Sequence, residues 1–302
     1  MKKNSTSIAV FKTLVYSDVF GSPLTFDELY RYLYRHKISK KDLRVFLRST
    51  PHVKKIGAYY VLLGREALVA KHYPKVKESK RKKGIAEKTI KILSKIPTIQ
   101  MIGISGSLAV NSATKEADID LFIITRHNAL WITRLLVTGI VYLQNKKRAA
   151  HVRIAPDTIC TNMWMSEKHL TLPHKNLFIA REVVQMQVVM DRNNTYAAFL
   201  QANVWVYTYF PNFAKQLSFA KKTIFPSVVF ALINMPVYCI QWLYMRKKRT
   251  TETISLHYAA FHPQDISKLV LQTYTNRLRV YKNHKDVKNV STPDTSNITP
   301  GS

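Results

Sequence analysis

Acidic side chains are scarce in this chain. Its 302 residues carry 18 Asp+Glu against 47 Lys+Arg, a formal net charge of +29. Two cysteines exclude a disulfide framework, and 8 glycines with 12 prolines exclude collagen-like and Pro/Gly-rich chains. The hydrophobic content of 46% excludes a wholly disordered protein, because it supplies enough apolar surface for a core. Because acids are scarce, any two carboxylates at a chemically useful spacing stand out. Because the two cysteines give no sign of an oxidising compartment, the cytoplasm is the expected location.

The positive charge is concentrated at the two ends of the sequence. Residues 1–100 hold 23 basic and 7 acidic side chains, residues 101–210 hold 11 and 7, and residues 211–302 hold 13 and 4. Basic flanks attract polyanions such as nucleic acid, anionic lipid or phosphorylated substrates. A solvated surface is the alternative interpretation. We expect a polyanionic acceptor or nucleic acid as a partner.

One uncharged stretch is long enough to be considered as a membrane segment. Residues 224–245 lack charge and are bounded by basic residues on both sides, so no orientation in a bilayer is favoured. The stretch also contains Pro226, Pro236, Asn234 and Gln241. We interpret it as a buried or groove-forming helical segment, and contact with a membrane stays open as the alternative.

The front of the chain predicts a small winged-helix-like domain at residues 1–64. Thr25 and Glu28 have the spacing of a capping box, and Ser39 is placed to cap a third helix. Residues 53–56 and 59–63, separated by Gly57-Ala58, predict a β-hairpin. The third helix would be basic, as expected for contact with DNA, although protein contacts or a scaffold role fit the same pattern.

Residues 65–96 predict a basic helical connector that Gly84 bends or breaks. The run of basic residues at 80–83 is typical of a solvated helix face. The alternative is that it guides a nucleic-acid backbone, which it would contact without reading the base sequence.

The chemistry is concentrated in the middle of the chain. A β-rich run at residues 98–105 precedes Gly106-Ser107, and the next strand contains Asp118 and Asp120. Residues two apart in a strand point to the same side, so the two carboxylates can hold one or two divalent cations between them. Paired carboxylates with bound metal are the arrangement that phosphoryl and nucleotidyl transfer require. Gly106 permits close approach to a phosphate, which the Ser107 hydroxyl and nearby amides can bind.

This pattern resembles the signature of the polymerase-β-type nucleotidyltransferase superfamily, and is most similar to its small bacterial and archaeal members. The resemblance rests on Gly106-Ser107 and, after ten intervening residues, Asp118-Ile119-Asp120-Leu121. Those proteins usually have a glycine where this chain has Asn111, which tolerates a left-handed backbone better than most residues. The resemblance implies that Asp118 and Asp120 are catalytic and bind Mg²⁺ or Mn²⁺. It also implies that Gly106 and Ser107 bind the NTP substrate.

The third carboxylate that active members carry on a neighbouring strand is not evident. The strand expected at residues 158–165 holds Asn162 at its centre, with Asp157 before it and Glu167 after it. Asn162 can offer a carbonyl to a metal but cannot accept a proton at neutral pH. Arg126 and Arg134 are further candidates for phosphate contacts, with surface or helix-packing roles as the alternative.

We therefore expect an α+β protein: a winged-helix-like front, a nucleotidyltransferase-fold core with a mixed sheet at residues 97–200, a helical part at 201–284 and a disordered tail at 285–302. A further helix is expected at 178–190, and both cysteines are expected to be buried. The expected function is metal-dependent transfer of a nucleoside monophosphate from an NTP to a hydroxyl. The alternative is a nucleic-acid-binding regulator with a degenerate core.

Overall fold

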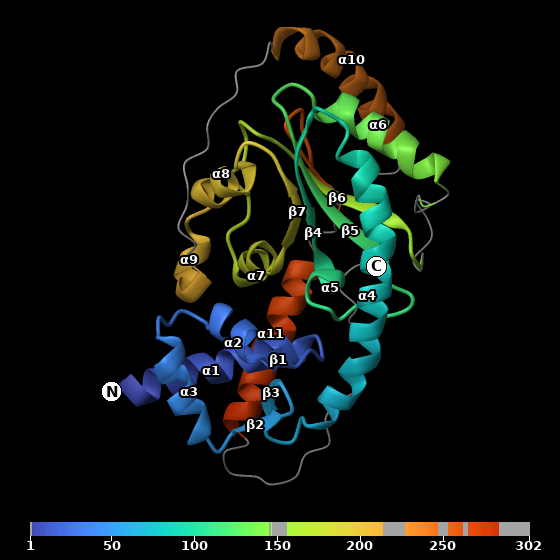
Figure 1. The fold of residues 1–302 in the computed structure, drawn as a ribbon. Coiled ribbons are helices and arrows are strands. Elements are labelled where there is room, and N and C mark those ends of the chain that lie inside the picture. The colour runs from blue at the N-terminus through green and yellow to red at the C-terminus, as the bar shows by residue number, and fades with distance from the viewer. Residues whose placement is uncertain are drawn as a thin grey trace.

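The structure is a computed structural model that describes residues 2–144, 146, 156–213, 227–246, 253–261 and 265–283. Helices and a mixed sheet alternate along the chain, as the predicted α+β class requires (Figure 1). The helices are α1 (Lys2–Val19), α2 (Phe26–Arg31), α3 (Lys40–Arg48), α4 (Ala67–Leu93), α5 (Gly106–Ala109), α6 (Leu130–Leu143), α7 (Leu177–Gln185), α8 (Thr195–Ala202), α9 (Val206–Tyr209), η1 (Pro211–Phe213), α10 (Ser227–Arg246) and α11 (Asp265–Asn283). The strands are β1 (Leu24–Thr25), β2 (Val53–Ile56), β3 (Tyr59–Leu62), β4 (Ile99–Ile104), β5 (Ile119–Thr125), β6 (Ile159–Ser166), β7 (Gln187–Asp191), β8 (Thr253–Ile254) and β9 (Tyr258–Ala260).

The first helices and the small sheet form at the predicted positions. The capping box is present at α2, where the Thr25 amide donates to Glu28 Oε2 over 2.9 Å and the Thr25 side chain accepts from the Glu28 amide. Ser39 caps α3 by accepting from the Asp42 amide over 3.1 Å. The predicted hairpin is confirmed as β2 and β3, and β1 pairs with the other side of β3.

A six-stranded sheet forms the middle of the molecule, with strand order β7-β4-β5-β6-β9-β8. All its neighbouring strands are antiparallel except β5 and β6, which run parallel. The predicted strand at 158–165 is therefore confirmed as β6 beside β5. Because β5 and β6 run in the same direction, their first residues meet at one edge of the sheet and the residues that follow them meet at the other.

Both faces of β5 are covered, which explains its continuous apolar sequence. Ile119, Leu121 and Ile123 pack in the buried cluster that contains side chains of α4 and α6. The alternate residues Phe122 and Ile124 pack in a second cluster with side chains of α7 and α8. Asp120 has the same parity as Phe122, so it lies on the α7 face of the sheet.

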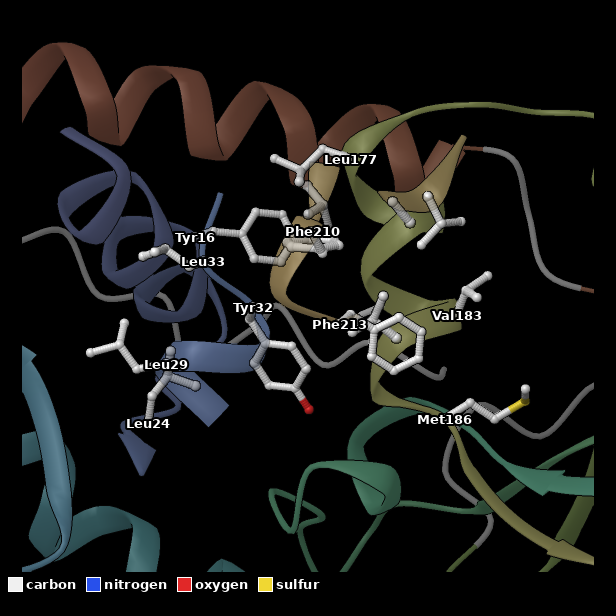
Figure 2. Close-up of a cluster of buried hydrophobic side chains, with 14 of the residues drawn as sticks. Tyr16, Leu24, Leu29, Tyr32, Leu33, Leu177, Val183, Met186, Phe210 and Phe213 are labelled. Atoms are coloured by element: carbon white, nitrogen blue, oxygen red, sulfur yellow. The ribbon is translucent and has the colours of Figure 1, made fainter. Parts of the chain in front are cut away.

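The front helices and the central sheet share one hydrophobic core. Tyr16, Leu29 and Tyr32 of the front unit belong to one buried cluster with Val183 of α7 and Phe213 of η1, and in Figure 2 Tyr32 points toward Phe213. Helix α11 returns from the C-terminal part and packs along α1 (Figure 1), where the rings of Tyr16 and Tyr274 stand 5.5 Å apart. These contacts fix α7 between the front unit and the sheet.

Buried ion pairs connect distant parts of the chain at the same junction. Asp18 of α1 is 5% exposed and binds Arg65 over 2.6 Å. It also binds Arg277 of α11. Asp18 thus joins three distant parts of the chain. Removing one partner of such a pair is costly, because it leaves the other charge buried without compensation.

Two predicted boundaries are wrong. Helix α4 continues without interruption through Gly84, because buried residues on both sides of it, Lys82 and Ala86, anchor the helix against the core. The helix predicted at 178–190 ends at Gln185, and the backbone then becomes extended at Met186. Residues 187–191 form β7, which pairs with the free edge of β4.

Helix α10 packs on α6 with one side and leaves the other side exposed. Asn234 is 2% exposed and accepts from the Trp131 amide over 2.7 Å, while Leu232 is 74% exposed. Cys239 is exposed, contrary to the prediction, and Cys160 is partly buried. In the parts of the chain that the structure describes, no helix is long and apolar enough to cross a membrane. The tail predicted to be disordered, 285–302, lies outside the described residues.

Candidate active site

Asp118 and Asp120 come together at the start of β5. Asp118 immediately precedes the strand and Asp120 is its second residue, and the two side chains are 5% and 4% exposed. The parallel pairing of β5 and β6 places Cys160 opposite Asp120. One ligand atom from each of these three residues lies within 4.8 Å of the others. Two carboxylates held this close repel each other unless a cation lies between them.

The donor set fits a hard divalent cation. Carboxylate oxygens are the ligands that Mg²⁺ and Mn²⁺ prefer, whereas the Cys160 thiol is a poor ligand for either. The Asn162 side-chain amide donates to Asp120 Oδ1, and the Cys160 thiol donates to Asn162 Oδ1. Asn162 therefore orients the Asp120 carboxylate. At this corner of the sheet, Asp118 and Asp120 are the residues that could hold a metal.

Gly106 lies directly against Asp120, and a larger residue there would displace the Asp120 carboxylate. Its φ of 62° is in the left-handed region, and a Cβ at this position would collide with Asp120 Oδ2. The turn after β4 is held to β5 by the Ser105 amide, which donates to the Asp120 carbonyl over 3.0 Å. The predicted proximity of the Gly-Ser turn and the paired carboxylates is thus present in the structure.

The left-handed backbone expected at Asn111 is also present. Its φ is 53°, and its side-chain oxygen accepts from Lys83 Nζ over 2.7 Å. The Ser112 amide donates to the Ser107 carbonyl over 2.9 Å and closes the turn. An asparagine therefore replaces the usual glycine without disturbing the local backbone, because it adopts this conformation at low cost.

A pocket of about 290 Å³ opens beside this corner of the sheet. On the side of the sheet, Ser105, Gly106, Asp120 and Asn162 supply polar atoms to this pocket. Further polar side chains line it from other segments: His174, Asn176, Glu182, Thr253, Ser267 and Lys268. Neither Asp118 nor Ser107 is among the described residues that line it. The remaining wall is mostly apolar and comes from β5, α7 and the residue after it, α8, β9 and α11, with Phe122, Ile179, Val183, Met186, Phe199, Tyr258 and Ile266 among its side chains. Such a cavity, apolar with a few convergent polar groups, is typical of a small-molecule site.

Glu182 of α7 is a second acid in this pocket, which the sequence analysis missed. Its carboxylate accepts a hydrogen bond from the Gly106 backbone and another from Gln185 Nε2 over 2.5 Å. Burial raises the pKa of Glu182 to about 7, against the opposing effects of the Gly106 hydrogen bond and the neighbouring Arg181. Gly106 thus lies between two carboxylates, Asp120 and Glu182.

The sequence contains one weak signal for Glu182, which is its isolation among scarce acids. It is the only acid between Glu167 and Asp191 in a chain with 18 acids in total. It occupies a predicted helix, however, and no local motif connects it to residues 106–120. Only the packing of α7 against the sheet, fixed by the front unit, brings it to the pocket.

The other candidates for the third acid occupy different places. Asp157 forms ion pairs with Arg81 over 2.6 Å and Lys82 over 2.8 Å, so it joins the loop before β6 to α4. Glu167 follows the last residue of β6, at the opposite edge of the sheet from Asp120. Asn162 is the candidate that contacts Asp120 directly.

The basic run in α4 is only partly solvated, which corrects its interpretation as a solvated face. Lys82 is fully buried and donates to the carbonyls of Lys115 and Ala117, over 2.9 and 2.8 Å. It therefore anchors the loop that leads into Asp118. A lysine buried in this way has its charge compensated by carbonyl oxygens and the Asp157 carboxylate.

The two arginine candidates for phosphate contacts lie elsewhere. Arg134 stacks over Phe261 at 4.6 Å and donates to Gln241 Oε1, which joins α6 to α10. Arg126 donates to the Pro97 carbonyl over 3.3 Å. Neither is among the described residues that line the pocket.

Comparison with protein families supports the same corner of the molecule. Residues 86–171 match the family model of the nucleotidyltransferase domain. The resemblance to the polymerase-β-type nucleotidyltransferase superfamily is therefore confirmed over this segment, which contains Gly106, Asp118 and Asp120. No curated protein and no solved structure is significantly similar to the chain. The matched segment ends before α7, so Glu182 and most of the apolar wall lie outside it.

Proposed function

We propose that this protein transfers a nucleoside monophosphate from an NTP to a hydroxyl acceptor. The observation that carries the proposal is the close approach of Gly106 to Asp120, with Asp118 beside it, inside the segment that matches the nucleotidyltransferase domain. In the reaction, the acceptor oxygen forms a bond to the α-phosphorus. The bond between the α-phosphorus and the oxygen that bridges to the β-phosphate breaks, and pyrophosphate leaves with that oxygen. The acceptor proton passes to a base.

Asp118 and Asp120 would hold Mg²⁺ or Mn²⁺, which supplies positive charge to the oxygens of the transferring phosphate. The Gly106-Ser107 turn would hold the triphosphate by its backbone amides and the Ser107 hydroxyl. Positioning and electrostatics supply most of the rate in this class of reaction. The apolar wall of the pocket would exclude water from the transfer.

Glu182 is the residue that we assign to accept the acceptor proton. Its carboxylate hydrogen-bonds to the Gly106 backbone, so an incoming phosphate competes with it for the same amide. Once displaced from this amide, the carboxylate remains in the pocket with Asp120, free to take a proton. Asn162 would orient Asp120, because its amide donates to that carboxylate.

The test is label transfer from the α-phosphate of each NTP in the presence of Mg²⁺. Asp118→Asn and Asp120→Asn should each lower the rate at least about 100-fold, since losing the metal removes several kcal/mol of transition-state stabilisation. Glu87→Gln is the matched control, because Glu87 is an exposed acid on α4. The proposal fails if wild-type protein transfers no label to RNA, protein or small-molecule hydroxyls. It also fails if both Asp variants match the control.

We propose a polyanion as the acceptor, contacted by the front unit. Its element order is that of a winged helix, and Lys41, Arg44 and Arg48 are exposed on α3 beside Lys54 and Lys55 of β2. Such side chains bind phosphates with a steep salt dependence. Nucleic-acid binding that falls steeply with salt supports this assignment. If binding persists in Asp118→Asn/Asp120→Asn while wild type transfers no label, the protein is the regulator with a degenerate core.

A membrane surface is a second candidate partner, favoured by the outer side of α10. Leu232, Ile240 and Leu243 are 74%, 67% and 60% exposed, and Leu143 at the end of α6 is 82% exposed. No acid occurs between Asp191 and Glu252, whereas basic runs follow both helices in sequence. Exposed apolar side chains with basic neighbours are typical of helices that lie in an anionic lipid interface.

Co-sedimentation with lipid vesicles tests this partner. Wild type should bind anionic vesicles and not neutral ones, and Ile240→Glu/Leu243→Glu should abolish binding. Val45→Glu is the control, because Val45 is 60% exposed on α3, far from α10. Equal binding by the double variant and the control contradicts a role for α10.

A further inference from the structure

Three histidines meet at the edge of the sheet opposite to Asp118 and Asp120. His127 lies two residues after β5, His169 lies three residues after β6, and His257 immediately precedes β9. The parallel pair β5–β6 ends at this edge, and β9, antiparallel to β6, begins there. One ring nitrogen of each histidine lies within 4.8 Å of the others. Strand β5 separates the two clusters by about 17 Å, at roughly 3.4 Å per residue from Asp120 to Thr125.

Backbone hydrogen bonds hold the three histidines in place. The Ser166 amide donates to the His257 carbonyl over 3.0 Å, and the His169 amide donates to the Ser166 carbonyl over 2.8 Å. The His127 amide donates to Glu167 Oε1 over 3.1 Å. These hydrogen bonds use backbone groups of the three histidines and leave their ring nitrogens unused. The backbone of the site is therefore in place before any ligand enters, and only side-chain rotation is left to binding.

The imidazole nitrogens have few protein partners. His257 Nδ1 is buried and has no hydrogen-bond partner among the described residues. Ser166 Oγ is 3.5 Å from His127 Nδ1, at the limit of a hydrogen bond. A buried nitrogen without a partner costs about 1–3 kcal/mol, so its persistence needs an explanation. A ligand that accepts electron pairs from all three rings provides one.

We propose that His127, His169 and His257 together bind one divalent transition-metal ion, of which Zn²⁺ is the best fit. Three imidazoles with water as the fourth ligand are a common zinc donor set, and nitrogen ligands disfavour Mg²⁺. The His169 and His257 rings stack at 4.0 Å with 8° between their planes. Stacked rings direct their in-plane lone pairs side by side, so binding requires His169, which is exposed, to turn toward the others.

The consequence of binding is a clip between distant parts of the chain. His257 belongs to the β8–β9 hairpin, whereas His127 and His169 belong to the loops after β5 and β6. Tyr258, the next residue after His257, lines the candidate active pocket together with Thr253 and Ala260. A bound ion would therefore fix one wall of that pocket from the opposite edge of the sheet.

The test measures metal binding directly and is independent of transferase activity. Full-length protein is dialysed against a chelator and titrated with Zn²⁺ by calorimetry, and with Co²⁺ by visible absorption, in an Asp118→Asn/Asp120→Asn/Cys160→Ser background. This background removes the other cluster of possible ligands. We expect one bound Zn²⁺ per chain and a Co²⁺ spectrum of four-coordinate nitrogen and oxygen ligands without a thiolate band.

Variants in the same background assign the ligands. His169→Ala, at an exposed position that does not burden folding, should weaken Zn²⁺ binding more than about 100-fold, since even a hydrogen-bond partner of a metal ligand contributes 10–100-fold. His257→Ala should do the same. His52→Ala, an exposed histidine in the front unit, should bind as its parent does. The proposal is overturned if the parent binds no Zn²⁺, or if His169→Ala binds as tightly as His52→Ala.

Discussion

The two edges of the β5–β6 pair carry opposite kinds of metal-binding chemistry. The edge where the strands begin has buried carboxylates, Asp118 and Asp120, and a glycine pressed against one of them. The edge where they end has three imidazoles on three separate loops. Oxygen ligands select hard cations such as Mg²⁺, and imidazole ligands select Zn²⁺ and its neighbours. One strand pair thus separates a proposed catalytic metal from a proposed structural one.

The comparison also separates two ways in which a sequence encodes a site. The site residues between 106 and 120 are close in sequence, so their spacing alone predicts a site. The histidines are spread over 130 residues, so they lack the short spacing that metal ligands on one helix or in one loop usually have. The order of strands in the sheet is what brings them together, and that order is a long-range property.

The largest expected effect is a reciprocal loss of metal selectivity. Asp118→Asn/Asp120→Asn should abolish Mn²⁺ binding and leave Zn²⁺ binding unchanged, because the two clusters share no residue. His169→Ala should do the reverse. Calorimetric titration of both variants with both metals gives four dissociation constants to compare. If either variant loses both metals, the two edges are not independent and the comparison fails.

Gly106→Ala should damage the carboxylate edge alone. The added Cβ meets Asp120 Oδ2, and alanine at a φ of 62° is strained by about 1 kcal/mol, so we expect a loss of roughly 2–3 kcal/mol in stability. Gly84→Ala is the matched control, because Gly84 lies inside α4 and a Cβ added there has no neighbouring atom within 4 Å. It should stabilise the protein by about 0.5–1 kcal/mol. Urea denaturation measures both, and a harmless Gly106→Ala contradicts the close approach.

Glu182→Gln should change how stability depends on pH. Burial raises the pKa of Glu182 to about 7 from an ordinary value of 4.5. Folding therefore favours the protonated form, and this contribution is complete below pH 4.5 and lost as the pH rises through 7. Wild type should lose up to about 3 kcal/mol relative to Glu182→Gln between pH 4.5 and 8. Urea denaturation without metal at both pH values gives the difference. The Glu87→Gln control should keep the wild-type pH dependence, because Glu87 is exposed. A Glu182→Gln variant that loses as much stability as wild type and the control would contradict the prediction.

The smallest expected effect is on the β8–β9 hairpin. Zn²⁺ at 100 times its dissociation constant should stabilise the protein by about 2.7 kcal/mol if binding is linked to folding of the whole chain, and by less if only the hairpin is clipped. Hydrogen exchange of residues 253–261 with and without Zn²⁺ measures this. Protection of the hairpin should increase in wild type and stay constant in His169→Ala. Equal protection in both proteins argues against the clip.

Local chemistry made part of the fold predictable. The Thr25–Glu28 capping box, the Ser39 cap and the left-handed Asn111 depend on neighbouring residues, and all three are present in the structure. The apolar run of β5 predicted a strand covered on both faces. The segment that matches the nucleotidyltransferase domain was visible through the Gly-Ser turn and the paired aspartates.

Long-range packing accounts for what the sequence did not reveal. Residues 187–191 have a helical pattern but form an edge strand, because β4 offers an unpaired edge. Lys82 belongs to a charged run, yet it is buried by carbonyls of a loop 33 and 35 residues away. Glu182 reaches the pocket because α7 packs in one buried cluster with side chains of the front helices and the sheet. Figure 2 shows Val183 of α7 and Tyr32 of the front unit in this cluster.

A crystal structure with Mn²⁺ and a non-hydrolysable NTP analogue tests the central claim most directly. The account predicts anomalous scattering from Mn²⁺ bonded to Asp118 and Asp120 oxygens at about 2.1–2.2 Å, with the triphosphate on the Gly106-Ser107 turn and Glu182 released from the Gly106 amide. A nucleotide bound elsewhere, with no anomalous peak between the two aspartates, would contradict it.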